Sequence, residues 1–471
     1  MGMSAAFVLS ALVQFLLGLV VAWLLGPAEF GAYALAVAAG ILLQTLCFEW
    51  LRLGATRFFH AAATRLRRRL VSAFLASAVL AGLLAVLAWP LLPAPLPGGR
   101  LLLLALVPGL ALAAGFLDLV AAMLRARFRE ADYARVLLVR NALGITLVPL
   151  AAGLTGKAEA AALALFASLV AAALAAWRLE TAGPDPAPEG GEAEMPSLGA
   201  LAGYSGPVVA TNLLYLALFF ALRSWAALTG GLALAGQVSL ALDFVLKLFT
   251  TFGSALDLWL FQRAVQAARD EGPEAGQAQL HRNQELVLSI LLAMALGLLL
   301  VIEALDVLLV RPDFRGLFAP AVMLLTPGIF LYALIQYAVH PYAQLAQRTR
   351  SLPITALAVL ACAGAGGAVL VWLPPGLAGI GLVLAAAMAA GLLLLAARSP
   401  GYQAPSPRFL GKLTVAILAM VLPVALVRQW DSGLLAALAA IALGAAGFAL
   451  AAWLLDLAGL RQIRLPRRAV S

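Results

Sequence analysis

The sequence has few charged and few reactive side chains for a chain of 471 residues. Only 11% of the residues are charged, two are cysteine and three are histidine, whereas 64% are hydrophobic. A soluble protein of this size needs more polar groups to cover its surface, so the composition indicates a chain that folds in lipid. Cys47 and Cys362 fall inside apolar segments without metal-ligand or redox spacing. We therefore expect both to be inert packing residues.

The motifs of catalysis are missing as well. We find no Gly-rich loop followed by Lys and Ser or Thr, no His, Asp and Glu cluster with metal-ligand spacing, and no serine with a matching His and acid. The connections expected outside the membrane are too short to carry a catalytic surface in water. We therefore predict that the chain is not an enzyme, binds no metal and carries no cofactor.

Long apolar runs occupy most of the chain. Each is close to the roughly 20 residues that a helix needs to cross a bilayer, and few alternate with period two as a β-barrel strand would. We predict an all-α polytopic membrane protein in two pseudo-symmetric six-helix lobes plus a terminal helix pair. The fourteen expected spans are 5–25, 31–49, 70–90, 101–124, 136–155, 158–177, 203–227, 235–258, 286–309, 318–339, 353–373, 377–397, 412–428 and 434–457.

The basic residues predict the orientation of these spans. The net charge is +9, and most of the 31 Lys and Arg residues gather at alternate connections. That distribution follows the positive-inside rule and argues against nucleic acid as a partner. We predict a multi-pass membrane protein with both termini in the cytoplasm. The basic clusters lie at 52–69, 125–135, 263–282, 348–350, 398–412 and 461–468.

A flexible connection divides the chain. The segment 181–194 is rich in Gly, Pro, Ala and Glu and has the composition of a linker. We predict an N-terminal lobe at 1–179, a cytoplasmic linker at 180–198, a C-terminal lobe at 199–398, and a helix pair with a basic tail at 399–471. Gly31 and Gly236 open similar short stretches at the starts of spans two and eight, which favours duplication.

One polar stripe marks the span 235–258. Steps of four, three, four and three residues separate its members, which places them on one helical face: Asp243, Lys247, Thr250, Ser254 and Asp257. An ionisable group at mid-membrane is costly and faces a partner or a hydrated cavity, so the stripe predicts a hydrated interior face. The alternative is that Asp243 and Lys247 only neutralise each other at i, i+4.

Other polar residues are scattered over several further spans. Asn212, Tyr215 and Arg223 share a face of span 203–227. Arg140 lies about a turn from its helix end, so it and Arg223 either face the interior or extend to water. Asp118 is two turns from Arg125, which could be its counter-ion, and Glu49 and Arg52 are i, i+3 at the end of span two.

A familiar turn joins the first two spans. Leu25 to Ala36 reads LGPAEFGAYALA, and it resembles the first hairpin of the polysaccharide-exporting branch, which includes the O-antigen flippases, of the multidrug/oligosaccharidyl-lipid/polysaccharide (MOP) flippase superfamily. The resemblance continues in Phe48 to Arg52, in Arg311 to Phe314 and in Gln347 to Arg350. In topology it covers nearly the whole chain.

The resemblance implies a fold, a substrate and site residues. It implies two lobes that alternate between inward-open and outward-open states and carry an undecaprenyl-diphosphate-linked glycan across the lipid bilayer of a bacterial cytoplasmic (inner) membrane. Other polysaccharide assembly proteins are further partners that the resemblance implies. A diphosphate needs fixed cations, so the expected substrate-binding residues are Arg52, Arg140, Arg223 and Lys247, with Asn212 and Tyr215 beside them. Asp118, Asp243 and Asp257 are candidates for coupling to H⁺ or Na⁺.

Two departures narrow the resemblance. Span 5–25 contains no charge, whereas multidrug exporters often carry an acid there and lipid II flippases carry charged residues. Fourteen spans rather than twelve also favour a lipid-linked substrate over a drug, since the resemblance implies that the terminal pair helps to hold a prenyl tail. The alternatives are a cation-coupled small-molecule or multidrug exporter and a non-transporting scaffold of a polysaccharide assembly complex.

Overall fold

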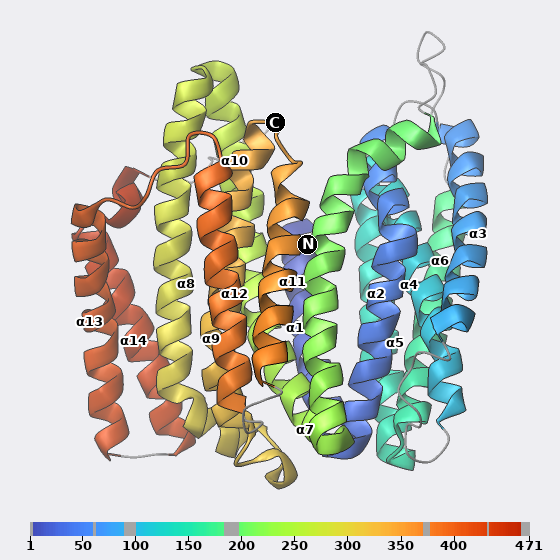
Figure 1. The fold of residues 1–471 in the computed structure, drawn as a ribbon, viewed down its shortest axis with the longest axis horizontal. Coiled ribbons are helices and arrows are strands. Elements are labelled where there is room, and N and C mark those ends of the chain that lie inside the picture. The colour runs from blue at the N-terminus through green and yellow to red at the C-terminus, as the bar shows by residue number, and fades with distance from the viewer. Residues whose placement is uncertain are drawn as a thin grey trace. The chain divides into compact units, whose positions relative to one another are not determined.

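A computed structural model describes residues 3–59, 63–88, 100–182, 197–370, 377–430 and 433–462 (Figure 1). Over these ranges the chain is helical and forms no strand, which confirms the predicted all-α class for the described residues. The reason is the solvent. In lipid, every backbone N–H and C=O must find its partner inside the chain, and an α-helix satisfies them within one segment.

Two compact units, Met1–Leu240 and Ala241–Ser471, make up the chain. Unit 1 holds α1 (Met3–Leu25), α2 (Pro27–Phe58), α3 (Ala63–Ala88), α4 (Leu101–Ala126), α5 (Glu130–Thr155), α6 (Ala158–Ala182) and the first part of α7 (Leu198–Asp270). Within it α4 packs against both α2 and α6, and α5 packs against α6 and α1.

Unit 2 holds the rest of α7 and all later elements. These are α8 (Pro273–Leu309), the short η2 (Pro312–Phe314), α9 (Phe318–Leu334), the π-helical turn η3 (Ile335–Val339), α10 (His340–Leu345), α11 (Ser351–Leu370), α12 (Leu377–Arg398), α13 (Pro407–Trp430), α14 (Leu434–Leu454) and η4 (Leu457–Gln462). In this unit α12 packs against α9 and α11, α13 pairs with α14, and both of them contact α8.

Helix α7 is two helical limbs joined at a glycine. It runs for 73 residues, and Gly231 inside it has a φ of 71° and a ψ of −174°. A positive φ is strained for residues that carry a Cβ, which explains why glycine stands at the break. Two separate spans, 203–227 and 235–258, were predicted on either side of this residue.

Twelve described helices are long and apolar enough to cross a membrane, against the fourteen spans predicted. The two numbers differ at α7, whose two limbs carry two predicted spans but count as one helix, and at α1, which is represented only by Val13–Leu25. The count of fourteen and the two six-helix lobes stay predictions. The same holds for the predicted domain limits, because residues 183–196 of the linker lie outside the described residues.

Glycines govern the start of α2. Gly26 adopts a φ of 73° between α1 and α2, and Pro27 occupies the first turn of α2, where its missing N–H is not needed. Farther on, a Cβ on Gly31 would lie 2.0 Å from the Leu232 oxygen, and one on Gly236 would lie 1.9 Å from the Pro27 oxygen. The two stretches that looked alike in the sequence therefore touch backbone to backbone.

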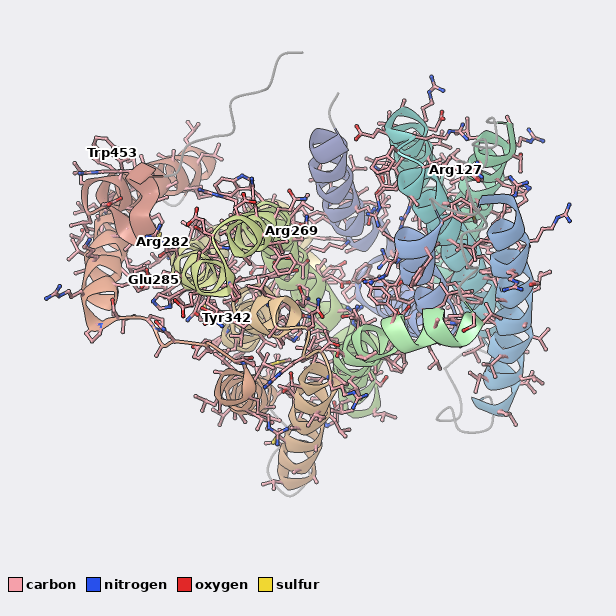
Figure 2. The ribbon with its side chains drawn as sticks, turned by 90° about the horizontal axis from the view of Figure 1, so that it is seen from above. Arg127, Arg269, Arg282, Glu285, Tyr342 and Trp453 are labelled. Atoms are coloured by element: carbon pink, nitrogen blue, oxygen red, sulfur yellow. The ribbon has the colours of Figure 1, made fainter. Side chains whose placement is uncertain are left out.

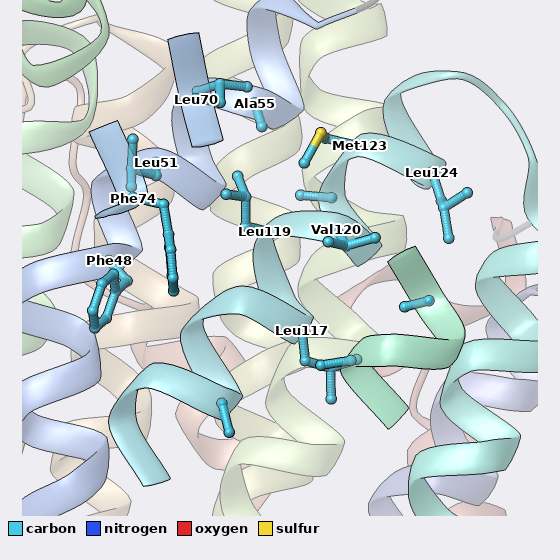
Figure 3. Close-up of a cluster of buried hydrophobic side chains, with 14 of the residues drawn as sticks. Phe48, Leu51, Ala55, Leu70, Phe74, Leu117, Leu119, Val120, Met123 and Leu124 are labelled. Atoms are coloured by element: carbon cyan, nitrogen blue, oxygen red, sulfur yellow. The ribbon is translucent and has the colours of Figure 1, made fainter. Parts of the chain in front are cut away.

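A hydrophobic cluster fixes α2, α3 and α4 against one another (Figure 3). The Phe48 and Phe74 rings stack at 4.6 Å between centroids, and the Phe74 and Phe116 rings meet edge to face at 5.3 Å. A Cβ on Gly115 would lie 2.8 Å from the Phe48 ring, so glycine lets α4 approach this ring. The cluster holds the helices that carry the polar residues described next.

Candidate functional site

A charged cavity of about 160 Å³ lies inside unit 1. Residues of α1, α2, α4 and α5 line it: Gln14, Arg52, Leu117, Asp118, Ala121, Ala122, Arg125, Tyr133, Val136, Leu137 and Arg140. Three of the nine residues predicted to bind substrate or couple ions, Arg52, Asp118 and Arg140, therefore meet at one cavity. Each of these side chains is about one-third exposed.

Asp118 is the carboxylate of this cavity. Its Oδ2 accepts a hydrogen bond from Gln44 Nε2 at 2.9 Å, and its Oδ1 lies 3.7 Å from Arg140 Nη1. The predicted pairing of Asp118 with Arg125 is not the one formed. Arg125 instead points its Nη2 at Thr56 Oγ1 at 3.4 Å, so α5 supplies the counter-ion that the sequence analysis sought on α4 itself.

Arg52 is held by its own helix. Its Nε donates to Glu49 Oε2 at 2.9 Å and its Nη2 contacts the other carboxylate oxygen, so the two groups meet fork to fork. This geometry fixes the guanidinium in direction and leaves part of it open to the cavity. The predicted i, i+3 relation between Glu49 and Arg52 is thus an ion pair.

Helical spacing explains how the remaining lining side chains converge. Tyr133, Val136, Leu137 and Arg140 follow each other at i, i+3, i+4 and i+7 on α5, which is one face of a helix. Asp118, Ala122 and Arg125 fall on one face of α4 in the same way. The small residues Ala121 and Ala122 leave the space between the charged groups open.

The cavity carries more positive than negative charge. Among the lining residues, Arg52, Arg125 and Arg140 stand against Asp118 alone. Arginines in a partly desolvated site attract an anion more strongly than in water, and their planar fork matches phosphate oxygens. A void of this size holds on the order of ten water molecules, which also accommodates a diphosphate. The arrangement suits binding rather than bond-breaking chemistry.

Three predicted residues of unit 1 lie elsewhere. Asn212, Tyr215 and Arg223 are on the first limb of α7, and none of them belongs to the lining of this cavity. Tyr215 and Arg223 are buried. The burial of Arg223 therefore argues against the alternative prediction, in which its side chain extends into water.

The polar stripe lies in unit 2. Asp243, Lys247 and Asp257 are on the second limb of α7, each partly exposed, while the intervening Val245 and Phe249 are buried. The Thr250 hydroxyl bonds the Leu246 oxygen at 2.7 Å and the Ser254 hydroxyl bonds the Thr251 oxygen at 3.2 Å. The stripe is thus a face of one helix, as its spacing predicted.

Sequence reasoning missed several polar residues of the site. Gln14, Gln44 and Tyr133 were not predicted as site residues. A signal existed for two of them. Gln44 lies two turns before Arg52 on α2, and Tyr133 lies two turns before Arg140 on α5. Nothing in the spacing of the first span marks Gln14, because its partners come from other helices.

The bundle of long apolar helices makes the chain a multi-pass membrane protein. No protein-family model and no curated protein matches it. Solved structures do, and they share its fold rather than its sequence. The lipid II flippase MurJ in an inward closed conformation aligns with a TM-score of 0.67 at 12% identity, over 98% of this chain and 99% of that one.

Two further structures extend the comparison. An inward-facing multidrug resistance MATE family transporter of the MOP superfamily aligns with a TM-score of 0.56 at 18% identity, over 84% of this chain and 95% of that one. A MOP superfamily transporter from Pyrococcus furiosus, described as having a binding pocket of reversed polarity, aligns at 0.54 and 18%, over 86% and 96%. The chain therefore has the fold of MOP superfamily transporters.

Proposed function

We propose that the chain is a MOP-type flippase that moves an undecaprenyl-diphosphate-linked oligosaccharide, such as an O-antigen or exopolysaccharide unit, across the bacterial inner membrane by alternating access. The observation that carries the proposal is the cavity of unit 1, where three arginines and one aspartate meet among apolar helices. A lipid-linked diphosphate needs such fixed cations, because its charge is costly in a low-dielectric interior.

The state of Asp118 supports a role for Arg140 in substrate binding. At 3.7 Å the contact between the two side chains is longer than a charge-assisted hydrogen bond. An incoming phosphate that approaches to about 2.8 Å would compete well for this guanidinium. Arg52 is bound more closely by Glu49 and is expected to act as a fixed point of positive charge beside it.

The other predicted residues keep their assigned roles within the proposal. Arg223, Lys247, Asn212 and Tyr215 are expected to contact substrate at other stages of transport, and Asp118, Asp243 and Asp257 are expected to couple transport to H⁺ or Na⁺. The helix pair α13 and α14 is expected to hold the prenyl tail, and other polysaccharide assembly proteins remain expected partners. The fold neighbours lend support, since one of them is a lipid II flippase by its description.

A flipping assay tests the proposal. Purified protein is reconstituted into vesicles with a fluorescent undecaprenyl-diphosphate oligosaccharide, and its arrival in the opposite leaflet is followed by quenching. Arg140→Gln should slow flipping roughly ten- to a hundredfold, because one charge-assisted hydrogen bond is worth about 1.5–3 kcal/mol. The control is Arg135→Gln on the same helix, whose side chain is 67% exposed. It should flip at the wild-type rate.

Other outcomes separate the alternatives. If wild-type protein fails to move the glycolipid but its expression changes drug sensitivity, the chain is an exporter. A triple variant tests the scaffold alternative: Arg52→Gln, Arg140→Gln and Asp118→Asn in one protein. If this variant leaves polysaccharide export unchanged in cells that lack paralogues, the cavity charges have no transport role, and the result favours a non-transporting scaffold. Matched expression levels are required for both comparisons.

A further inference from the structure

A second basic cavity lies in unit 2, and none of the residues assigned to transport lines it. It measures about 40 Å³ between the end of α7, the start of α8 and η4, and it is lined by Leu260, Arg263, Gln279, Arg282, Asn283, Leu286, Ala458 and Gly459. Space of this size holds on the order of three water molecules, which is close to the size of one phosphate group. Neither the stripe on α7 nor any residue of the unit 1 cavity takes part.

The two arginines of this cavity are not neutralised. No ion pair joins Arg263 or Arg282 to a carboxylate in the part of the chain that the structure describes. The nearby acids are engaged elsewhere. Glu285 lies 3.6 Å from His281, and Asp456 accepts a hydrogen bond from the Arg461 amide at 2.9 Å. The two guanidinium groups are therefore available to bind an anionic ligand.

The amide side chains of the cavity hold its shape. Asn283 Nδ2 donates to the Leu260 oxygen at 2.8 Å, which ties α8 to α7, and Gln279 Nε2 donates to Asn283 Oδ1 at 2.8 Å. Asn283 is buried, so this bridge is shielded from water. Ala458 and Gly459 of η4 also line the cavity, and their φ values are 54° and 72°.

Aromatic side chains place the cavity at a membrane surface. The Arg263 guanidinium lies 5.0 Å from the Trp259 ring, and that of Arg461 lies 5.0 Å from the Trp453 ring. Tryptophan gathers at bilayer interfaces, with Arg extending from beside it toward the headgroups. Figure 2 looks onto this end of the helices and labels Arg282 and Trp453.

The length of α8 also places the cavity at the membrane surface. Helix α8 has 37 residues, about 55 Å at 1.5 Å per residue, so it exceeds a hydrocarbon core of about 30 Å. Polar residues concentrate at its start, around Gln279 and Arg282, and the stretch from Leu286 to Ile302 is apolar apart from Ser289. The cavity thus stands where the apolar part of α8 begins, with Leu260 and Leu286 at its inner side.

We infer that this cavity binds the phosphate of an anionic phospholipid headgroup. Two unneutralised guanidinium groups match the oxygens of a phosphodiester. Basic pockets between membrane helices hold anionic headgroups in this manner, and the adjacent leucines suit the start of the acyl chains. The inference goes beyond the proposed transport function and does not depend on which substrate the chain carries.

A binding measurement on the purified full-length protein in detergent tests the inference. Fluorescent phosphatidylglycerol is titrated with wild type, with Arg282→Gln and with the double variant Arg263→Gln/Arg282→Gln, and anisotropy is read. We expect the double variant to bind about tenfold more weakly or worse, and unlabelled phosphatidylglycerol to displace the probe better than phosphatidylcholine. Arg269→Gln is the matched control, because Arg269 is exposed on α7, the helix that carries Arg263, and does not line the cavity.

Three outcomes would overturn the inference. Equal affinity in wild type and the double variant excludes the two arginines as ligands. An equal loss of affinity in Arg269→Gln would mean that only the net charge of the protein matters. Displacement of the probe by millimolar inorganic phosphate assigns the cavity to a free anion instead of a lipid. The single variant Arg282→Gln controls for misfolding, because this side chain is exposed, so its thermal unfolding should match that of the wild type. Flipping is not read in this experiment, so its result stands apart from the transport proposal.

Discussion

At the residue scale, the charged side chains between the helices of unit 1 divide into those that line the cavity and those that stabilise the fold. Arg127 and Glu180 belong to the second kind. Arg127 Nη1 lies 3.0 Å from Glu180 Oε1, and their side chains are 5% and 0% exposed. The Arg127 guanidinium also lies 5.0 Å from the Phe59 ring. Arg129, two residues further on, donates a hydrogen bond to the Leu179 oxygen at 2.9 Å. The turn between α4 and α5 is thus bonded to the last turn of α6.

Removing one partner of this pair should destabilise the protein strongly. Glu180→Ala leaves a buried guanidinium without its counter-charge, which typically costs about 3–5 kcal/mol. We expect a clear drop in the denaturant midpoint of the purified protein, measured by tryptophan fluorescence in detergent. The double variant Arg127→Met/Glu180→Leu should recover most of the loss, because it removes both charges together.

The exposed pair of Arg135 and Asp132, at 3.0 Å, provides the comparison. Arg135→Ala should change stability by less than about 1 kcal/mol, as expected for an exposed ion pair. If Arg135→Ala and Glu180→Ala shift the midpoint equally, burial does not govern the Arg127–Glu180 pair.

Glu29 shows how a motif residue serves structure. Its Oε2 accepts the Ala158 amide at 2.8 Å at the start of α6, and its Oε1 lies 2.5 Å from Arg100 Nη2. The carboxylate thus satisfies a free N–H at a helix N-terminus and meets the favourable end of the helix dipole. The most recognisable part of the sequence, Leu25 to Ala36, therefore ties α2 to α4 and α6.

At the element scale, glycine sets the contact between α2 and α7. Gly31 and Gly236 let the two backbones touch, with no room for a Cβ on either residue. This contact lies wholly inside unit 1. It explains in physical terms why both stretches open with glycine, a likeness that in the sequence suggested only duplication.

Gly236→Ala should therefore destabilise unit 1. The added Cβ would lie 1.9 Å from the Pro27 oxygen, so backbone must move, and overpacking of this kind costs about 1–3 kcal/mol or more. Gly203→Ala is the control on the first limb of α7, where a Cβ would meet nothing within 4 Å. It should be neutral or stabilising by up to about 1 kcal/mol, since alanine favours the helix. Thermal unfolding in detergent distinguishes the two, and equal midpoints for both variants would contradict the role given to the contact.

At the scale of the whole molecule, orientation follows from charge. The basic clusters at alternate connections predict that both termini face the cytoplasm. Fusions test this prediction. A green fluorescent protein placed after Ser471 should fluoresce, and alkaline phosphatase placed after Lys157 or Asp313 should be active. An active phosphatase after Ser471, with a silent one after Lys157, would reverse the orientation and move the charged cavity of unit 1 to the other side of the membrane.

The sequence alone predicted the class and much of the helix pattern. Apolar runs near 20 residues can only be satisfied in lipid as helices, so the all-α class needed no tertiary information. The stripe on α7 and the Glu49–Arg52 pair were also within reach, because both lie inside one helix and helical spacing determines which residues share a face.

Tertiary structure decided which helices bring their charges together. Asp118 is met by Arg140 from α5 and Gln44 from α2, not by Arg125 on its own helix. It also decided that Gly31 and Gly236 touch, and that Arg263 and Arg282 share a cavity with η4. Periodicity specifies the direction of a side chain from its own helix axis but not which helix lies opposite. Packing of the apolar faces around Phe48 and Phe74 sets those neighbours, and hence the cavity that we propose binds the diphosphate.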